Sequence, residues 1–250
     1  MRWIDRRGRI WPPMLLLCAA GFAQQAPAPP ATMQSPSSGA PAVPLAPRAS
    51  VTPQFLVVLD AAHGGTSTGA RFSSGALEKD INLNFSVRLR STLSAHGIGV
   101  VITRDSDQDI PSTARAETAN GASAAACILI HATATGSGVH LYTSSLAPTP
   151  LTKFMPWQTA QSAYVTQSLK LSSEIDSALA HAEIPVTLGR TSLQPMDSFA
   201  CPTVAVEIAP LQEGATTKGK DISDTGYQKS LVDALTAAID QWRNDWRQQP

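Results

Sequence analysis

The chain has 250 residues, enough for one domain with a sizeable core and additional segments around it. Its 19 basic and 19 acidic residues give a formal net charge of zero, so the overall basic excess typical of nucleic-acid-binding proteins is excluded and no nucleic acid partner is expected. The hydrophobic share of 43% is ordinary for a globular protein, and the mature chain has no transmembrane segment because no later apolar run is long enough.

The first 23 residues have the three-part pattern of a secretory signal peptide. Four arginines among the first nine residues precede a short apolar stretch from Met14 to Ala23, which ends in small residues. The predicted location is therefore outside the cytoplasm, in the periplasm or the cell envelope. Two alternatives are an amphipathic leader and lipoprotein anchoring through Cys18, although Leu17 is larger than the residue that usually precedes a lipoprotein cysteine.

Residues 24–53 are rich in Pro, Ala, Ser and Gln. A tract of this composition buries too little apolar surface to offset its ordering entropy, so it is predicted to be a disordered linker. The sequence is thus predicted to contain a signal peptide (1–23), a linker (24–53), a single folded domain (54–246) and a short tail (247–250).

From residue 54 onward, apolar runs alternate with amphipathic segments. Strands are predicted at residues 55–60, 100–103, 127–130, 139–143 and 203–208. Helices are predicted to begin at Glu78, to span 112–119 with Arg115 on the polar side, to span 159–181, and to end the domain with an apolar stripe from Tyr227 to Trp242. Strands that are apolar throughout indicate an α/β fold with a mixed, mostly parallel sheet covered by helices on both faces.

Two cysteines fall inside the predicted domain, Cys127 and Cys201. Their spacing fits neither a zinc finger nor a redox CxxC pattern. In an oxidising compartment they could pair only if the fold brings them close. Because Cys127 opens an apolar run, the expectation is two separate, buried thiols.

Four polar residues fall where an α/β sheet places its ligands, outside the carboxyl ends of the strands. His63 follows the first predicted strand, His131 ends the third, Glu207 lies near the end of the last, and Glu78 begins the first long helix. Taken singly, each has an ordinary explanation: a turn residue, a core histidine, or an acid favoured by the helix dipole. Taken together they indicate a site, because four unrelated polar residues are not expected to fall at the same edge of the sheet by chance.

The chemistry of this set is that of a zinc hydrolase. Catalytic zinc commonly takes two histidines and one glutamate and keeps a fourth position for water. A further carboxylate outside the ligand set can accept the proton of that water and pass it to the leaving amine.

These residues and the segments around them resemble a known family, the zinc-dependent N-acetylmuramoyl-L-alanine amidases of the amidase 3 type. The resemblance runs in order through residues 57–65, 69–70, 78–83, 101–107, 114–120, 128–132 and 202–208. It implies that His63, Glu78 and His131 bind one Zn²⁺ ion and that Glu207 is the catalytic acid and base. The implied substrate is peptidoglycan, cut between N-acetylmuramic acid and L-alanine. Asp60 is a candidate partner for the ring of His63.

The sequence departs from the family pattern at several positions. Ala61 and Ala62 stand where the family usually has Pro-Gly, the residues after Glu207 lack the usual glycine and aromatic, and Asp197 falls near a position where many members have arginine. None of these changes removes a predicted ligand. In some relatives an inserted helix blocks the cleft until a regulatory protein partner binds; no extra helix is evident here, and such a partner stays open.

Two points are left open by the sequence. The proline- and aromatic-containing stretch 144–158 could contact substrate at the cleft or pack its aromatic residues on the domain. The function also has alternatives: a peptidoglycan-binding module without catalysis, or a zinc peptidase that acts on another amide bond. His96, His140 and His181 have no evident partners and are expected to be surface or structural residues.

Overall fold

The computed structural model describes residues 55–213 and 218–247. The predicted signal peptide, the linker and all but the first residue of the tail lie outside this range. The elements, in chain order, are β1 (Leu56–Ala61), α1 (Glu78–Ala95), β2 (Gly99–Ile102), α2 (Ser112–Gly121), β3 (Ala126–Ala132), β4 (Val139–Ser144), η1 (Trp157–Ala163), α3 (Val165–His181), β5 (Val186–Thr191), η2 (Met196–Ser198), β6 (Thr203–Ile208) and α4 (Thr225–Arg247). Within the described residues, no helix combines the length and apolar character needed to cross a membrane.

The strands form one six-stranded sheet in the order β2-β1-β3-β6-β4-β5. All neighbouring pairs are parallel except β6 and β4, which are antiparallel. The prediction of a mixed, mostly parallel sheet is therefore confirmed. Because β1, β3 and β6 run in the same direction, their carboxyl ends meet at one edge of the sheet, where a site is expected.

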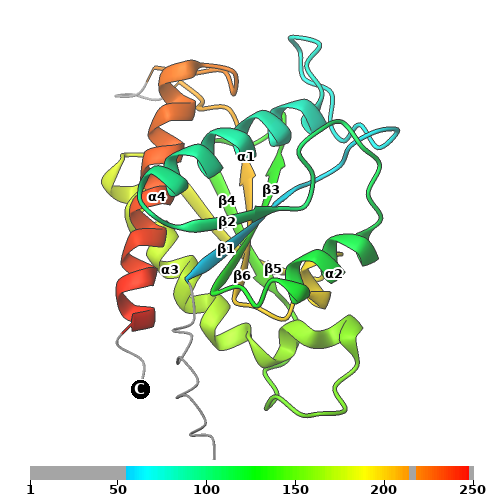
Figure 1. Cartoon of the computed structure of the whole chain (residues 1–250). Coiled ribbons are helices and arrows are strands. Elements are labelled where there is room, and N and C mark those ends of the chain that lie inside the picture. The colour runs from blue at the N-terminus through cyan, green and yellow to red at the C-terminus, as the bar shows by residue number, and fades with distance from the viewer. Residues whose placement is uncertain (1–54, 214–217, 248–250) are drawn as a thin grey trace, which may run out of the picture. The chain divides into compact units, whose positions relative to one another are not determined.

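Helices cover both faces of the sheet, as predicted (Figure 1). One face packs against α1, α3 and α4 in a large apolar core that includes Phe85, Leu171 and Leu235. The other face packs against α2 and the short turn η2, through residues such as Ala116 and Phe199. These helices bury the central strands on both sides, which explains why β1, β3 and β6 are apolar for most of their length.

Two elements differ from the prediction. Strand β5 was not predicted, because it is an edge strand that includes Gly189 and Arg190 and none of its residues is fully buried. The helix predicted to begin at residue 159 begins at Val165 instead. The residues before Val165 form the short helix η1, and Thr159 within it has non-helical dihedral angles.

Cys127 and Cys201 form a disulfide bond, so the expectation of two separate thiols is wrong. Cys127 lies in β3 and Cys201 lies just before β6, and these two strands are direct neighbours in the sheet. The Cα atoms of the two cysteines are 6.1 Å apart, within the range that a disulfide spans. Sequence spacing could not show the pairing because 74 positions separate the cysteines and the strand order was unknown.

Loss of this disulfide is expected to destabilise the domain. The double substitution Cys127→Ala/Cys201→Ala should lower the free energy of unfolding by about 2–4 kcal/mol, because a crosslink between distant positions restricts the unfolded chain. Urea titration followed by circular dichroism measures this change. Wild-type protein in reductant is the matched control, since it lacks the crosslink but keeps both sulfur atoms. Equal free energies for oxidised and reduced wild type would contradict the prediction.

Candidate metal centre

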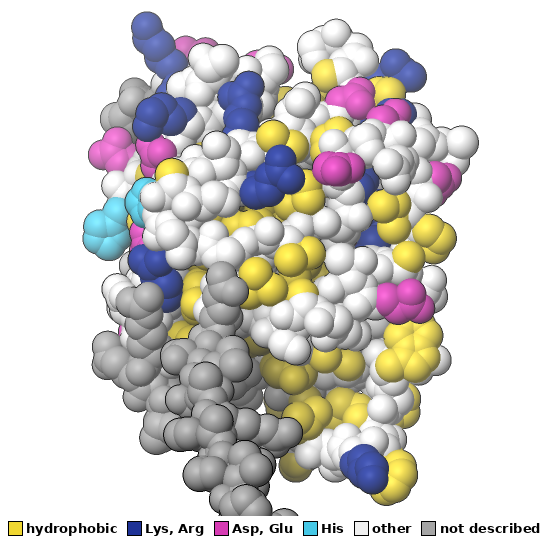
Figure 2. Space-filling view, viewed as in Figure 1, with side chains coloured by type: hydrophobic (Ala, Val, Ile, Leu, Met, Phe, Trp, Pro, Cys, Tyr) yellow, Lys and Arg dark blue, Asp and Glu magenta, His cyan; other side chains and the backbone are white. Residues whose placement is uncertain are grey.

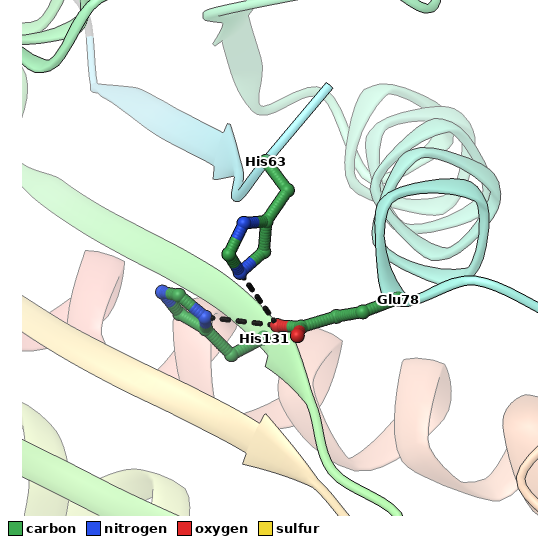
Figure 3. Close-up of side chains that lie close together, drawn as sticks. All are labelled: His63, Glu78 and His131. Atoms are coloured by element: carbon green, nitrogen blue, oxygen red, sulfur yellow. Dashed lines mark hydrogen bonds and ion pairs between the residues drawn. The ribbon is translucent and has the colours of Figure 1, made fainter. Parts of the chain in front are cut away.

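Three of the predicted site residues converge on one point from three different elements (Figure 3). His63 comes from the loop after β1, Glu78 is the first residue of α1, and His131 lies near the end of β3. The Oε1 atom of Glu78 is 3.3 Å from Nε2 of His63 and 3.0 Å from Nδ1 of His131. The two imidazole rings are nearly perpendicular, at 89°, with centroids 5.6 Å apart. The structure therefore brings these three predicted residues close together.

The donor set of this cluster suits a divalent ion such as zinc. One potential ligand atom from each of the three residues lies within 4.8 Å of the others. Tetrahedral ligands bound to zinc at about 2.1 Å lie about 3.4 Å from one another, so small side-chain movements would bring the three atoms to bonding distance. Two neutral imidazoles and one carboxylate are also the donor types that zinc commonly takes in hydrolases.

Glu78 is held in place from several sides at the N-terminus of α1. Its Oε2 atom accepts a hydrogen bond from the backbone N–H of Ala70 at 2.8 Å. Gly69 lies so close to Oε2 that a Cβ atom at this position would clash with it. Burial alone would raise the pKa of Glu78, but the hydrogen bonds from the rings of His131 and His63 and from Ala70 outweigh it and hold the pKa well below its usual range. The carboxylate is therefore ionised at neutral pH.

The loop that carries His63 turns sharply after β1. His63 itself has a φ of 63°, in the left-handed region that few residues other than glycine adopt, and Gly64 follows with a φ of 134°. The Nδ1 atom of His63 lies 2.9 Å from the hydroxyl of Ser67. This contact fixes the rotation of the ring and directs Nε2 toward Glu78.

Two buried arginines hold the backbone of this loop. Arg104 donates to the carbonyl oxygens of Ala61 and Ala62, at 2.8 and 3.0 Å. Arg115 donates to the carbonyl oxygens of Ala61 and His63, at 2.7 and 2.6 Å. The two alanines fit at this turn because the positive φ begins at His63 and not before it. The arginines thus position His63 through its main chain.

Asp60 does not have the role predicted for it. Its buried Oδ1 atom accepts hydrogen bonds from Arg115 at 2.8 Å and from the hydroxyl of Thr103, whereas the ring of His63 contacts Ser67 and Glu78. Asp60 therefore supports His63 indirectly, through Arg115. The placement of Arg115 on the polar side of its helix is also wrong, because only 5% of this residue is exposed and its guanidinium points into the loop.

Glu207 lies on β6 directly beside His131 in the register of the parallel pair β3–β6. Register partners in adjacent strands lie about 5 Å apart and project from the same face of the sheet. Glu207 is therefore on the side of the sheet that carries His131, and 30% of its side chain is exposed. Its Oε2 atom lies 2.7 Å from Nδ1 of His140, a residue of β4 that sequence reasoning left without a partner.

A cavity of about 330 Å³ opens beside His63 and His131. Its remaining lining residues are Asp60, Ala62, Ser67, Asp109, Ile110, Pro111, Ser112, Arg115, Gln194 and Pro195. A peptide or sugar group bound there would lie next to the candidate metal centre. Asp197, close to this lining in sequence, is buried and hydrogen-bonded to the hydroxyls of Ser144 and Ser192.

The stretch 144–158 does not line this cavity. Phe154 is 89% exposed, and Trp157 borders a second cavity together with residues of α2. The aromatic residues are thus not packed away inside the domain. In the view of Figure 2, hydrophobic side chains gather at the lower right, in the region of α2 and of the segment between β4 and α3.

Comparisons with known proteins identify the family of the chain. The sequence model of one family, described as N-acetylmuramoyl-L-alanine amidase, matches residues 57–241. The chain is 42% identical over 77 residues to the N-acetylmuramoyl-L-alanine amidase AmiA of Escherichia coli K12, a match that covers 31% of this chain and 27% of AmiA. It is 30% identical over 132 residues to AmiC of Neisseria meningitidis, which covers 50% of this chain and 32% of AmiC.

Solved structures support the same fold. The crystal structure of the N-acetylmuramyl-L-alanine amidase Ami1 from Mycobacterium smegmatis superposes with a TM-score of 0.60 at 21% sequence identity, covering 76% of this chain and 97% of that one. The matches to AmiA and AmiC span only about a third or less of those proteins. The family model, in contrast, covers well over half of this sequence, from the first strand into the last helix. The chain therefore belongs to the amidase 3 family, the N-acetylmuramoyl-L-alanine amidases.

Proposed function

We propose that this chain is a zinc-dependent N-acetylmuramoyl-L-alanine amidase that hydrolyses the amide bond between N-acetylmuramic acid and L-alanine in peptidoglycan. The observation that carries the proposal is the convergence of His63, Glu78 and His131 with Glu207 on the neighbouring strand, in a chain of this family. Membership of the family supports peptidoglycan as the substrate, and the cavity beside the cluster supports the binding of a group next to it.

One zinc ion would be held by His63, Glu78 and His131. Bound in such a site, zinc makes water a stronger acid at neutral pH and polarises a carbonyl oxygen. Ionised Glu78 supplies the negative charge that partly balances the ion, and the two imidazoles add none, so the site keeps a net positive charge. The hydrogen bonds of Ser67 and of Ala70 orient His63 and Glu78.

Glu207 would act as the general base and then as the general acid. Glu207 is the register partner of His131, lies outside the ligand cluster, and has a side chain that is partly exposed to the solvent that supplies the attacking water. It would accept a proton from that water as the oxygen attacks the amide carbon. It would then donate the proton to the nitrogen of L-alanine as the C–N bond breaks.

We also propose that the chain acts outside the cytoplasm, as a single catalytic domain (54–246) that follows a signal peptide (1–23) and a linker (24–53). The disulfide between Cys127 and Cys201 supports an oxidising compartment such as the periplasm, because cytosolic thiols are kept reduced. We include regulation by a protein partner in this proposal because some relatives in the family are regulated in this way. The exposed stretch around Phe154 offers surface for contacts.

Product analysis tests the proposed reaction. Purified protein with zinc should release stem peptides with a free N-terminal L-alanine from peptidoglycan, and mass spectrometry identifies them. Incubation with a chelator should stop the release, and added zinc should restore it, because the attacking water needs the ion. Binding to intact sacculi without release would instead favour a binding module. Cleavage within the stem peptide would favour a zinc peptidase.

A further inference from the structure

We propose that His140 is a positioning residue for Glu207: its Nδ1–H group holds one carboxylate oxygen so that the other faces the reacting atoms. This inference rests on the proposed amidase function. No step of the reaction described above uses His140, and no sequence pattern connects it with Glu207.

The contact between the two residues follows from the strand register. His140 in β4 is the direct partner of Glu207 in the antiparallel pair β4–β6, and His131 is the partner of Glu207 on its other side. Three side chains therefore project from the same face in a row across three strands. Nδ1 of His140 and Oε2 of Glu207 are 2.7 Å apart. Because a carboxylate only accepts hydrogen bonds, ionised Glu207 requires that the imidazole proton be on Nδ1.

The ring of His140 is fixed in this orientation by the loop before β4. Gly136, with a φ of 88°, packs against the far side of the ring, where an added Cβ would lie 2.6 Å from Nε2. The loop is held in turn by Gln212, which follows β6 and bonds to the hydroxyl of Ser137 and to the carbonyl oxygen of Gly136 at 3.0 Å each. The side chain of His140 is 16% exposed, so the ring has little freedom to turn away.

This arrangement gives the two carboxylate oxygens of Glu207 different roles. Oε2 is engaged by His140, which leaves Oε1 for the proton of the attacking water. Without the donor, the partly exposed carboxylate could rotate about its last side-chain bond and spend less time in the productive orientation. A positioning role of this kind affects the chemical step, because proton transfer requires a donor–acceptor distance of about 2.6–3.2 Å. It should have little effect on substrate binding.

Two substitutions with the same side-chain branching test the role of the donor. His140→Leu removes the N–H group, and kcat should fall about 10–100-fold, the range found for residues that orient metal ligands by hydrogen bonds. His140→Asn keeps an N–H donor at the δ position and should retain most of the wild-type kcat. In both variants KM and zinc content should stay within about twofold of wild type, because His140 contacts neither the cavity nor the metal cluster.

A double-mutant cycle with Glu207→Gln shows whether His140 acts through Glu207. In the Glu207→Gln background, His140→Leu should cause no further loss of kcat. The inference is overturned by wild-type kcat in His140→Leu, by equal losses in the Leu and Asn variants, or by a change confined to KM. If His140→Leu does not fold, His140→Gln replaces it, since its amide sits one bond further out and should not rescue kcat. An inactive wild-type enzyme would contradict the amidase function instead.

Discussion

Replacement of Glu207 by glutamine is expected to lower kcat by about 10²- to 10⁴-fold, the usual contribution of general acid–base catalysis. The amide of glutamine has nearly the same shape as the carboxylate but cannot accept a proton from water at neutral pH. The substitution should leave the zinc content near one ion per chain, because Glu207 lies outside the cluster of His63, Glu78 and His131. Release of stem peptides from peptidoglycan measures the rate, and elemental analysis measures the zinc.

The matched control for this variant is Glu183→Gln, the same chemical change at an exposed position just after α3. It should keep wild-type kcat and zinc content. Turnover by Glu207→Gln at the wild-type rate would remove Glu207 from the mechanism. Loss of zinc from Glu207→Gln would show that this carboxylate is a ligand and that the three-residue donor set is incomplete.

Replacement of His131 by alanine is expected to abolish stable zinc binding. Within the described residues the cluster offers three protein ligands, and the loss of one leaves two donors, fewer than catalytic zinc sites use. After gel filtration, the zinc content should fall from about one ion per chain to near zero. The rate of peptidoglycan hydrolysis should fall as well when the wild type and the variant are assayed at the same total zinc concentration.

His181→Ala is the control for this second variant, because His181 is an exposed residue at the end of α3. Within the described residues, its ring forms a hydrogen bond only to the backbone of its own helix. It should retain its zinc. The His131 variant should still fold, because Glu78 keeps the backbone N–H donors of Ala70 and Ala132. A folded His131→Ala protein that retains one zinc ion per chain would contradict the ligand set.

The sequence could place His63, Glu78 and His131 near one another because three features could be located without coordinates. His63 and His131 follow apolar runs that are clearly strands, and Glu78 begins an amphipathic helix. The rule that ligands bind at the carboxyl ends of parallel strands then places them at one edge. What the sequence could not supply was the strand order, which determines that β1, β3 and β6 are adjacent.

Strand order and strand direction explain the main features that were missed. His140 contacts Glu207 because β4 pairs with β6 in this antiparallel register, and nothing in the pattern of β4 indicates its neighbour or its direction. The disulfide of Cys127 and Cys201 likewise depends on the adjacency of β3 and β6. Each of these contacts joins residues that are distant along the chain.

The buried arginines were missed for a different reason. Arg104 and Arg115 carry charges that normally face solvent, and the sequence around Arg115 reads as the polar side of a short helix. Their burial is tolerated because their guanidinium groups donate to main-chain carbonyl oxygens of the loop at residues 61–63 and, for Arg115, to Asp60. Such a network depends on the local shape of a turn, which hydrophobic periodicity does not describe.

The covalent link between Cys127 and Cys201 has a consequence for the alignment of the reacting groups. It joins the strands that carry His131 and Glu207. A slip of one residue between these strands would turn Glu207 to the opposite side of the sheet, away from His131. By tying the two strands at their starting ends, the bond opposes such a slip even when hydrogen bonds between them open transiently.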